Sequence, residues 1–161
     1  MLEIRRGTAE RSYENTFFRE FAENLGKMFE KYNIDGLLIA NSKCAVESRL
    51  QIDALLIANN CICLIDFKNF AGEIILPKND NNFLEGKWVT KDNIRVKGGN
   101  SINPYKQLTV QKSRFSKVYK KHINENIYSE DTANPKHTKK IICFQKPIKL
   151  VGSIPSRDEM T

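Results

Sequence analysis

Asp53, Asp66 and Lys68 have the residue types of a site that could hydrolyse a phosphodiester bond. Carboxylate oxygens suit Mg²⁺, and the bound ion polarises a phosphate and lowers the pKa of a bound water. A nearby amine can then position or deprotonate that water. The triplet Asp66-Phe67-Lys68 is weak support by itself, because most such triplets lie at solvated sheet edges. The hypothesis therefore depends on the elements that bring these side chains together.

The segments that must position the three residues are two short strands, predicted at residues 50–58 and 61–67. Both are rich in Leu and Ile, and Asn59-Asn60 is a two-residue connection that tolerates the positive φ of a tight hairpin turn. Their other positions are apolar on both faces. Because strands of this kind are buried on both faces, we expect the hairpin to lie inside the protein.

The register of this hairpin places the polar side chains together. With Asn59 and Asn60 at the turn, Asp53 faces Asp66 and Gln51 faces Lys68, all from one face of the sheet. Two opposed carboxylates in a buried hairpin repel each other and lose hydration, so they require a proton, a cation or a metal ion. A divalent ion would meet that need, and the alternative is a structural ion-pair cluster.

The remaining elements alternate between helices and short strands. A helix from residue 12 to about 32 follows from apolar residues at Phe18, Phe21, Leu25, Met28 and Tyr32, with Glu14 on the same inward stripe. A second helix is predicted from Asn103-Pro104 to about residue 122, with Asn103 as its cap. Further strands are predicted at 36–40, 73–76, around 87–89 and at 141–144, and loops at 91–102 and 124–138.

Length and composition favour one globular domain. The chain has 161 residues, of which 40% are hydrophobic and 28% are charged, so it can bury a core. No apolar run has the length of a bilayer span, and the N-terminal segment is charged. Four cysteines without paired metal-ligand spacing are interpreted as reduced thiols. We expect a cytoplasmic protein without a membrane partner.

The net charge of +7 is concentrated at one end of the chain. Residues 101–161 contain 12 Lys and Arg against 5 Asp and Glu, whereas residues 1–100 are balanced at 14 each. A one-sided basic region favours a polyanionic partner, because neutralised phosphates release counterions. A basic surface that serves only solubility is the alternative.

The order of these motifs resembles a known family. Asp53 followed by Asp66-Phe67-Lys68 is similar to the signature of the restriction-endonuclease-like PD-(D/E)xK superfamily. More narrowly, residues 10–145 resemble the nuclease-related domain (NERD). The resemblance is carried by Gln51-Ile52-Asp53-Ala54-Leu55-Leu56-Ile57, Ile65-Asp66-Phe67-Lys68-Asn69-Phe70-Ala71-Gly72-Glu73-Ile74, Trp88 and Asn103-Pro104-Tyr105-Lys106-Gln107-Leu108.

The resemblance implies a fold and a metal site. The fold is α/β, a restriction-endonuclease-like core in which a central mixed β-sheet is flanked by helices. Mg²⁺ or Mn²⁺ would be held by Asp53, Asp66 and the backbone carbonyl of Phe67, with Lys68 as the catalytic cation. The second acid is Asp66 where the family more often has Glu, and this shorter side chain could shift the metal.

Two supporting residues are also implied by the resemblance. An acid on the first helix joins the site in similar nucleases, and Glu14 is the matching position. It follows Tyr13, where the family often has Gly. Gln107 matches the family's helical glutamine, near the site or the DNA backbone.

Nucleic-acid contacts are expected chiefly from the second helix. Its basic residues could follow phosphates beside the site, although a solvated helix face explains them equally well. The residues predicted to bind nucleic acid are Gln51, Asn103, Lys106, Arg114 and Lys117.

The sequence thus predicts a single nuclease-related domain over residues 1–161, the N-terminal part of a longer protein. Its predicted function is Mg²⁺-dependent endo- or exonuclease activity on nucleic acid, with DNA favoured. The alternative is a non-catalytic module that binds or recruits nucleic acid for a fused helicase-like or kinase-like region. The sequence leaves strand preference, sequence specificity and oligomeric state open.

Overall fold

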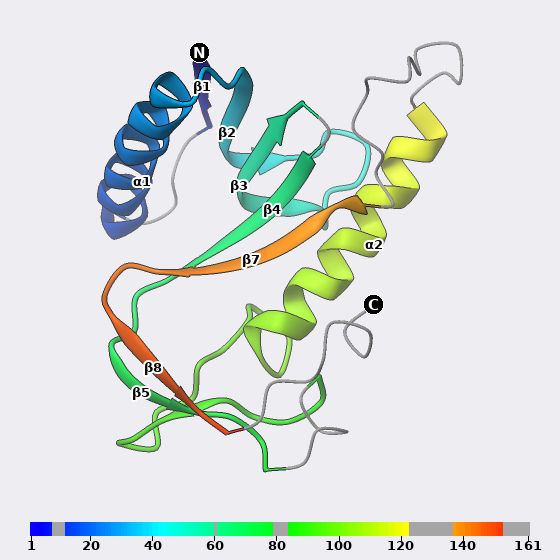
Figure 1. Ribbon diagram of the computed structural model, residues 1–161. Helices are drawn as coiled ribbons and strands as arrows, with labels where there is room; N and C mark the ends of the chain where they lie inside the picture. Colours follow the sequence, from blue (N-terminus) through cyan, green and yellow to red (C-terminus); the bar gives the residue numbers. More distant parts are fainter. Residues whose placement is uncertain (8–11, 60, 79–83, 123–136, 153–161) are drawn as a thin grey trace.

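The computed structural model describes residues 1–7, 12–59, 61–78, 84–122 and 137–152 (Figure 1). Two helices and eight strands follow one another in these segments. They are β1 (Leu2–Arg6), α1 (Ser12–Lys31), β2 (Gly36–Lys43), β3 (Gln51–Ala58), β4 (Cys61–Lys68), β5 (Gly72–Ile75), β6 (Val89–Thr90), α2 (Pro104–His122), β7 (Lys139–Phe144) and β8 (Ile148–Val151).

A five-stranded mixed sheet forms the centre of the fold. Its strand order is β1-β2-β3-β4-β7, with β2, β3 and β4 antiparallel and the two outer pairs parallel. Helices α1 and α2 lie on opposite sides of this sheet, each over its own hydrophobic cluster (Figure 1). The chain therefore has the predicted α/β fold with a restriction-endonuclease-like core.

Helix α1 covers one face of the sheet with an aromatic stripe. Phe17 and Phe18 are buried and pack against Phe67 of β4, with ring centroids 4.5 and 6.5 Å away. The predicted stripe was wrong in the last two turns, where Met28 is 55% and Tyr32 is 61% exposed. Because the α-helical repeat is 3.6 residues, the buried face continues instead through Ala22, Leu25 and Phe29.

Helix α2 covers the opposite face. Leu108 is buried there against Leu55 and Leu64 of the hairpin. Asn103 caps the helix as predicted, because its Oδ1 accepts a hydrogen bond from the Lys106 N–H at 2.7 Å.

A small second sheet extends the central one. Strands β4 and β7 lie side by side and lead into β5 and β8, which pair in parallel (Figure 1). The order of this sheet is β6-β5-β8, and its cluster contains Trp88 and Tyr105. Strands β1 and β8 were not predicted from the sequence, because each is a short edge strand whose residues are mostly exposed.

The hairpin register agrees with the prediction over most of its length. Five pairs join β3 and β4, from Ala58–Cys61 at the turn to Ala54–Ile65. Asn59 has the positive φ expected at the turn, 36°. The two strands are buried on both faces, because α1 covers one and α2 the other.

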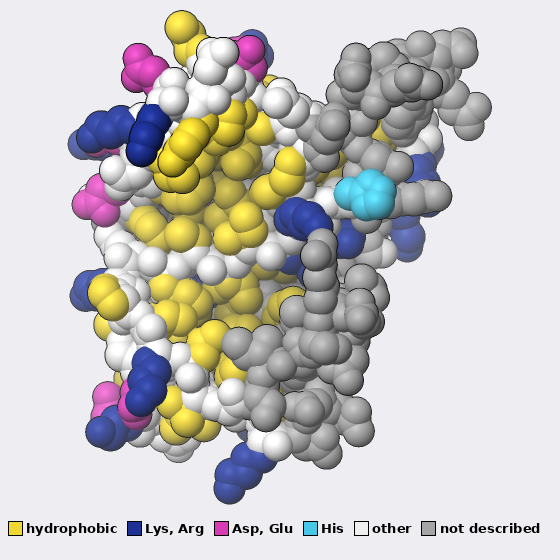
Figure 2. Space-filling view, viewed as in Figure 1, with side chains coloured by type: hydrophobic (Ala, Val, Ile, Leu, Met, Phe, Trp, Pro, Cys, Tyr) yellow, Lys and Arg dark blue, Asp and Glu magenta, His cyan; other side chains and the backbone are white. Residues whose placement is uncertain are grey.

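The surface and the cysteines add two observations. Hydrophobic side chains gather over the middle of the visible face, and charged side chains lie along its margins (Figure 2). All four cysteines are free thiols, as predicted. Neither helix in the described segments has the length and apolar character needed to cross a membrane.

Candidate metal centre

The candidate site lies where β3 and β4 separate. The last backbone pair between them is Ala54–Ile65, and beyond it the Asp53 carboxylate accepts a hydrogen bond from the Phe67 N–H, 2.9 Å from Oδ2. The predicted direct cross-strand pairing of Asp53 with Asp66 is therefore wrong in detail. The Asp53 side chain takes the place that a strand carbonyl would have, and this holds its carboxylate in the opening.

An irregularity in β2 and β3 accompanies this opening. Asn41 has a φ of 46°, and it interrupts the pairing between Ala40–Ala54 and Ser42–Ile52. As a result, Ile52 packs on the α2 side, with Leu108. Strict alternation would place Ile52 on the face opposite to Leu55, so the irregularity beside Asp53 is not visible in the hydrophobic pattern.

Asp66 and Lys68 form a buried ion pair on the α2 side of β4. Lys68 Nζ lies 2.8 Å from Asp66 Oδ2 and donates a hydrogen bond to Oδ1 at 3.0 Å. The side chains are only 5% exposed for Asp66 and 13% for Lys68. The ammonium therefore contacts both oxygens of Asp66, although its approach to Oδ2 lacks hydrogen-bond geometry.

Burial makes the charged form of Asp66 costly. The loss of hydration raises the pKa of Asp66 to about 7 from its ordinary value of 3.8, and Lys68 offsets only part of this rise. The neighbouring Asp53 charge raises the pKa of Asp66 further. Two carboxylates that disfavour each other's charge in a dry site are stabilised by an added cation.

A cavity on the α2 side joins these carboxylates to the helix. It measures about 210 Å³, including space open to solvent, and Asp53, Asp66, Gln107 and Gln111 contribute to its lining. Among the described residues, no donor reaches two buried oxygens of this lining, Gln107 Oε1 and Gln111 Oε1. The cavity therefore combines two carboxylates with amide oxygens that no described donor satisfies.

A second cavity opens from Asp53 toward the first turn of α1. It measures about 360 Å³ with its open part, and Arg6, Asn15, Asn41 and Asp53 contribute to its lining. Glu14 belongs to that same helical turn, but its side chain lies outside the described part of the structure. The predicted role of Glu14 therefore stays a prediction.

The residues present fit a divalent ion with oxygen ligands. Mg²⁺ is usually held by one or two carboxylates and keeps several waters, so Asp53 and Asp66 with uncharged oxygens nearby are a suitable donor set. The described residues contain no group of three or more His, Cys, Asp and Glu side chains placed to hold a metal. The ion would therefore depend on two carboxylates, amide or backbone oxygens and water.

Comparison with known families decides the assignment. The sequence model of the family described as "Nuclease-related domain" matches residues 13–145. The chain belongs to the nuclease-related domain family. No curated protein and no solved structure matches it.

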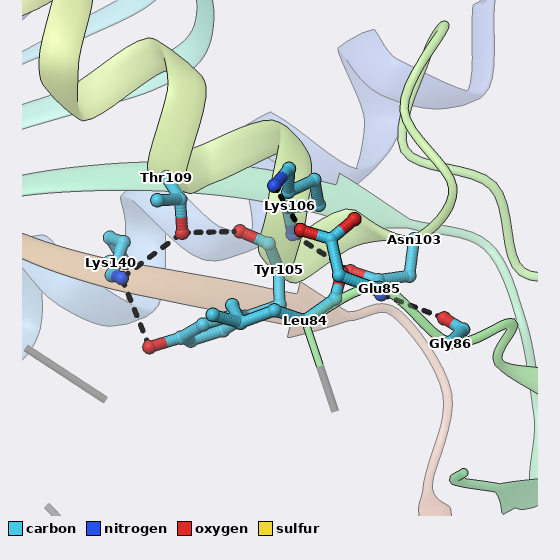
Figure 3. A network of polar contacts seen from close by, with 8 residues as sticks. All are labelled: Leu84, Glu85, Gly86, Asn103, Tyr105, Lys106, Thr109 and Lys140. Atoms are coloured by element: carbon cyan, nitrogen blue, oxygen red, sulfur yellow. Dashed lines mark hydrogen bonds and ion pairs between the residues drawn. The ribbon is translucent and has the colours of Figure 1, made fainter. Parts of the chain in front are cut away.

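The family's Asn-Pro element has a structural role in this chain. Asn103 is completely buried, and its Nδ2 donates hydrogen bonds to the carbonyls of Leu84 at 2.9 Å and Gly86 at 2.8 Å (Figure 3). With its Oδ1 capping α2, the side chain ties the preceding loop to the helix. This placement argues against the predicted contact of the Asn103 side chain with nucleic acid.

Three of the other residues predicted to bind nucleic acid lie on α2, and the fourth, Gln51, lies at the start of β3. Lys106 forms an ion pair with Glu85 (Figure 3), and Arg114 donates a hydrogen bond to the Arg49 carbonyl at 2.9 Å. Lys117 is exposed. Gln51 lines the cavity beside Asp66, but its predicted pairing with Lys68 is not among the pairs of β3 and β4.

Sequence reasoning missed Gln111, a further residue of this site. It lies one helical turn after Gln107 and reaches the same cavity. The four-residue spacing could have indicated it, because residues i and i+4 share a helix face. The family resemblance implied a role for Gln107 only, so Gln111 was not predicted.

Proposed function

We propose that this nuclease-related domain hydrolyses phosphodiester bonds of DNA with the help of Mg²⁺ or Mn²⁺. The observation that carries the proposal is the set formed by Asp53, Asp66 and Lys68 at the opening of β3 and β4. Their carboxylates lie beside a cavity with unsatisfied oxygens. Such a site gains stability from a cation and places it next to an amine.

The backbone of Phe67 supports the proposed ligand set. In a strand, the N–H and the carbonyl of one residue point to the same side. The Phe67 N–H points to Asp53, so its carbonyl also faces the opening. It lies beyond the last backbone pair of β3 and β4, and it can join the two carboxylates as a third oxygen ligand.

The bound ion would polarise the scissile phosphate and lower the pKa of a water. Each protein residue then has a distinct task. Asp53 and Asp66 hold the ion, and Lys68 carries a positive charge on the same edge of the sheet. Gln107 presents an uncharged acceptor from α2. The basic excess of residues 101–161 favours a polyanion such as DNA as the partner.

A non-catalytic nucleic-acid module is the second candidate, and the Asp66–Lys68 pair is the observation that favours it. Lys68 contacts both oxygens of Asp66, which neutralises the buried carboxylate without a metal. The remaining unsatisfied oxygens favour the nuclease, because a cluster that was only structural would gain from donors for them.

The deciding experiment measures metal binding and cleavage together. Calorimetry with Mg²⁺ and Mn²⁺ would be run on the wild type, Asp66→Asn and Lys68→Met, beside cleavage of single-stranded and duplex DNA. Asp66→Asn should lose metal binding and reduce cleavage at least ~100-fold. Lys68→Met should lose cleavage but retain metal, because it removes the amine and keeps both carboxylates.

A control variant tests whether these losses are specific to the site. Thr16→Ala changes an exposed residue of α1 and should preserve both properties. DNA binding by a wild type that takes up neither ion and cleaves neither substrate would establish the non-catalytic module.

A further inference from the structure

Gln107 and Gln111 form a pair of amides along one flank of α2. They are four residues apart, so their side chains lie one above the other on the helix. Both line the cavity that holds Asp53 and Asp66. The family resemblance directed attention to Gln107, whereas nothing in it assigned a role to Gln111.

The amide of Gln111 is oriented by the loop before β3. Its Nε2 donates a hydrogen bond to the Arg49 carbonyl at 3.3 Å, and the same carbonyl accepts one from Arg114 Nη1 at 2.9 Å. Because the nitrogen is held by the loop, Oε1 is the atom left for the cavity. That oxygen is buried, and no donor in the described part of the chain reaches it.

The balance of hydrogen-bonding groups around the cavity indicates what Oε1 contacts. Asp53, Asp66 and the two glutamines contribute acceptor oxygens, while the nearby ammonium of Lys68 is paired with Asp66. A buried acceptor without a donor lowers the stability of the folded state. Mg²⁺ and Mn²⁺ would bring donors in the waters they retain.

We propose that Gln111 is a positioning residue of the divalent-ion site, with its Oε1 accepting from the hydrated ion held by Asp53 and Asp66. The loop carbonyl of Arg49 keeps this oxygen aimed inward, so the loop between β2 and β3 supports the metal through Gln111. The inference rests on the proposed function, because the ion is the one the nuclease would use.

The test is Mn²⁺ affinity, measured by calorimetry without DNA. Gln111→Leu removes the oxygen at similar size and should weaken Mn²⁺ binding about tenfold, the lower end of the range for residues that support metal ligands. Gln111→Glu restores an oxygen and adds a charge, so its affinity should equal or exceed that of the wild type. Urea unfolding without divalent ions would confirm that each variant is folded.

Thr109→Val is the matched control, because it removes a polar group from the other flank of α2 and should leave the Mn²⁺ affinity unchanged. Wild-type affinity in Gln111→Leu, together with lost binding in Asp66→Asn, would overturn the role of Gln111 and leave the nuclease proposal intact. Weak binding in Gln111→Glu as well would show that the loop contact, and not the oxygen, matters. No binding by the wild type would overturn both proposals.

Discussion

The two flanks of α2 carry opposite chemistry although they belong to one helix. On the flank beside the opening of β3 and β4, Gln107 and Gln111 line a cavity with two carboxylates, and no described donor reaches their Oε1 atoms. On the other flank, Tyr105 and Thr109 contact the ammonium of Lys140, at 3.0 and 3.2 Å (Figure 3). We call the first the acceptor flank, because it presents unsatisfied oxygens. We call the second the donor flank, because it contains a half-buried cation with neutral partners.

Helical spacing explains how one element makes both surfaces. Each residue turns the helix by about 100°, so Tyr105 and Thr109 lie roughly opposite Gln107 and Gln111. Leu108 lies between the two sets and is buried against the sheet. Leu108, with Phe115 and Val118 packed against the same cluster, thus helps to set the helix orientation from which both polar flanks follow.

The second flank also gathers like charges. Burial lowers the pKa of Lys140. Burial is also the largest cause of the lowered pKa of Lys112, and the charges of Lys140 and Lys139 lower that pKa further. Within the described residues, none of these lysines has an acidic partner. The two flanks therefore suit opposite ligands, a cation at the first and an anion such as a phosphate at the second.

The largest expected effect concerns Asp66 of β4, which lines the cavity beside the acceptor flank. Because burial raises its pKa to about 7, the folded state binds the proton more tightly than the unfolded state does. Without divalent ions, this contribution to stability is complete below about pH 4 and is lost as pH rises toward 7. The stability of Asp66→Asn relative to wild type should therefore rise by about 2–3 kcal/mol between pH 5 and pH 8.

Urea unfolding of both proteins at several pH values measures this difference. The other titrating groups are the same in the two proteins, so their contributions to stability cancel. Saturating Mn²⁺ should stabilise the wild type and have little effect on the variant. A stability difference that does not change with pH would mean that Lys68 neutralises Asp66 fully. The acceptor flank would then have no unmet need for a cation.

A smaller effect is expected on the donor flank from Lys140→Met. This change removes two hydrogen bonds to neutral oxygens and a cation 4.2 Å from the centre of the Tyr105 ring. It also removes a buried charge, so the free energy of unfolding should fall by only about 1 kcal/mol. Urea unfolding at pH 7 measures the change, and Mn²⁺ affinity should be unaffected.

The exposed neighbour Lys139 supplies a control, because Lys139→Met should scarcely alter stability. A loss of 3 kcal/mol or more in Lys140→Met would indicate a broken buried ion pair. The second flank would then contain an acid, and the contrast between the flanks would fail.

The sequence predicted the central hairpin because its information is local. Apolar strands on both sides of Asn59-Asn60 define a turn, and the turn fixes a register that the structure confirms from Ala58–Cys61 to Ala54–Ile65. The cap at Asn103 is local in the same way. Local patterns were therefore sufficient for the hairpin and for the neighbourhood of Asp66 and Lys68, whereas the fold class came from the family resemblance.

The remaining features depend on contacts between distant segments. The separation of the strands at Asp53 follows from Asn41 and from a side chain that bonds the Phe67 N–H, neither of which periodicity records. Gln111 gains its position from the Arg49 carbonyl, far away in sequence. Edge strands such as β1 exist because a neighbour pairs with them, so their own residues give little signal.

The smallest expected effect tests whether the lysines of the donor flank repel one another in the free protein and also contribute to DNA binding. Lys112→Gln removes one of the charges that disfavour each other around Lys140. At low ionic strength the variant should be more stable than the wild type by a few tenths of a kcal/mol, and the gain should vanish near 0.5 M salt, where the charges are screened. Thermal unfolding at the two salt concentrations measures both values.

The same variant should bind DNA more weakly, with a salt dependence of the affinity reduced by about one counterion. Higher stability together with weaker DNA binding in Lys112→Gln would show that these lysines destabilise the free protein but favour an anionic partner. Lys27→Gln, at an exposed position of α1, is the control for a general loss of charge. Equal losses in DNA affinity from Lys27→Gln and Lys112→Gln would make the donor flank an ordinary solvated helix face, and the phosphate path would have to lie elsewhere on the domain.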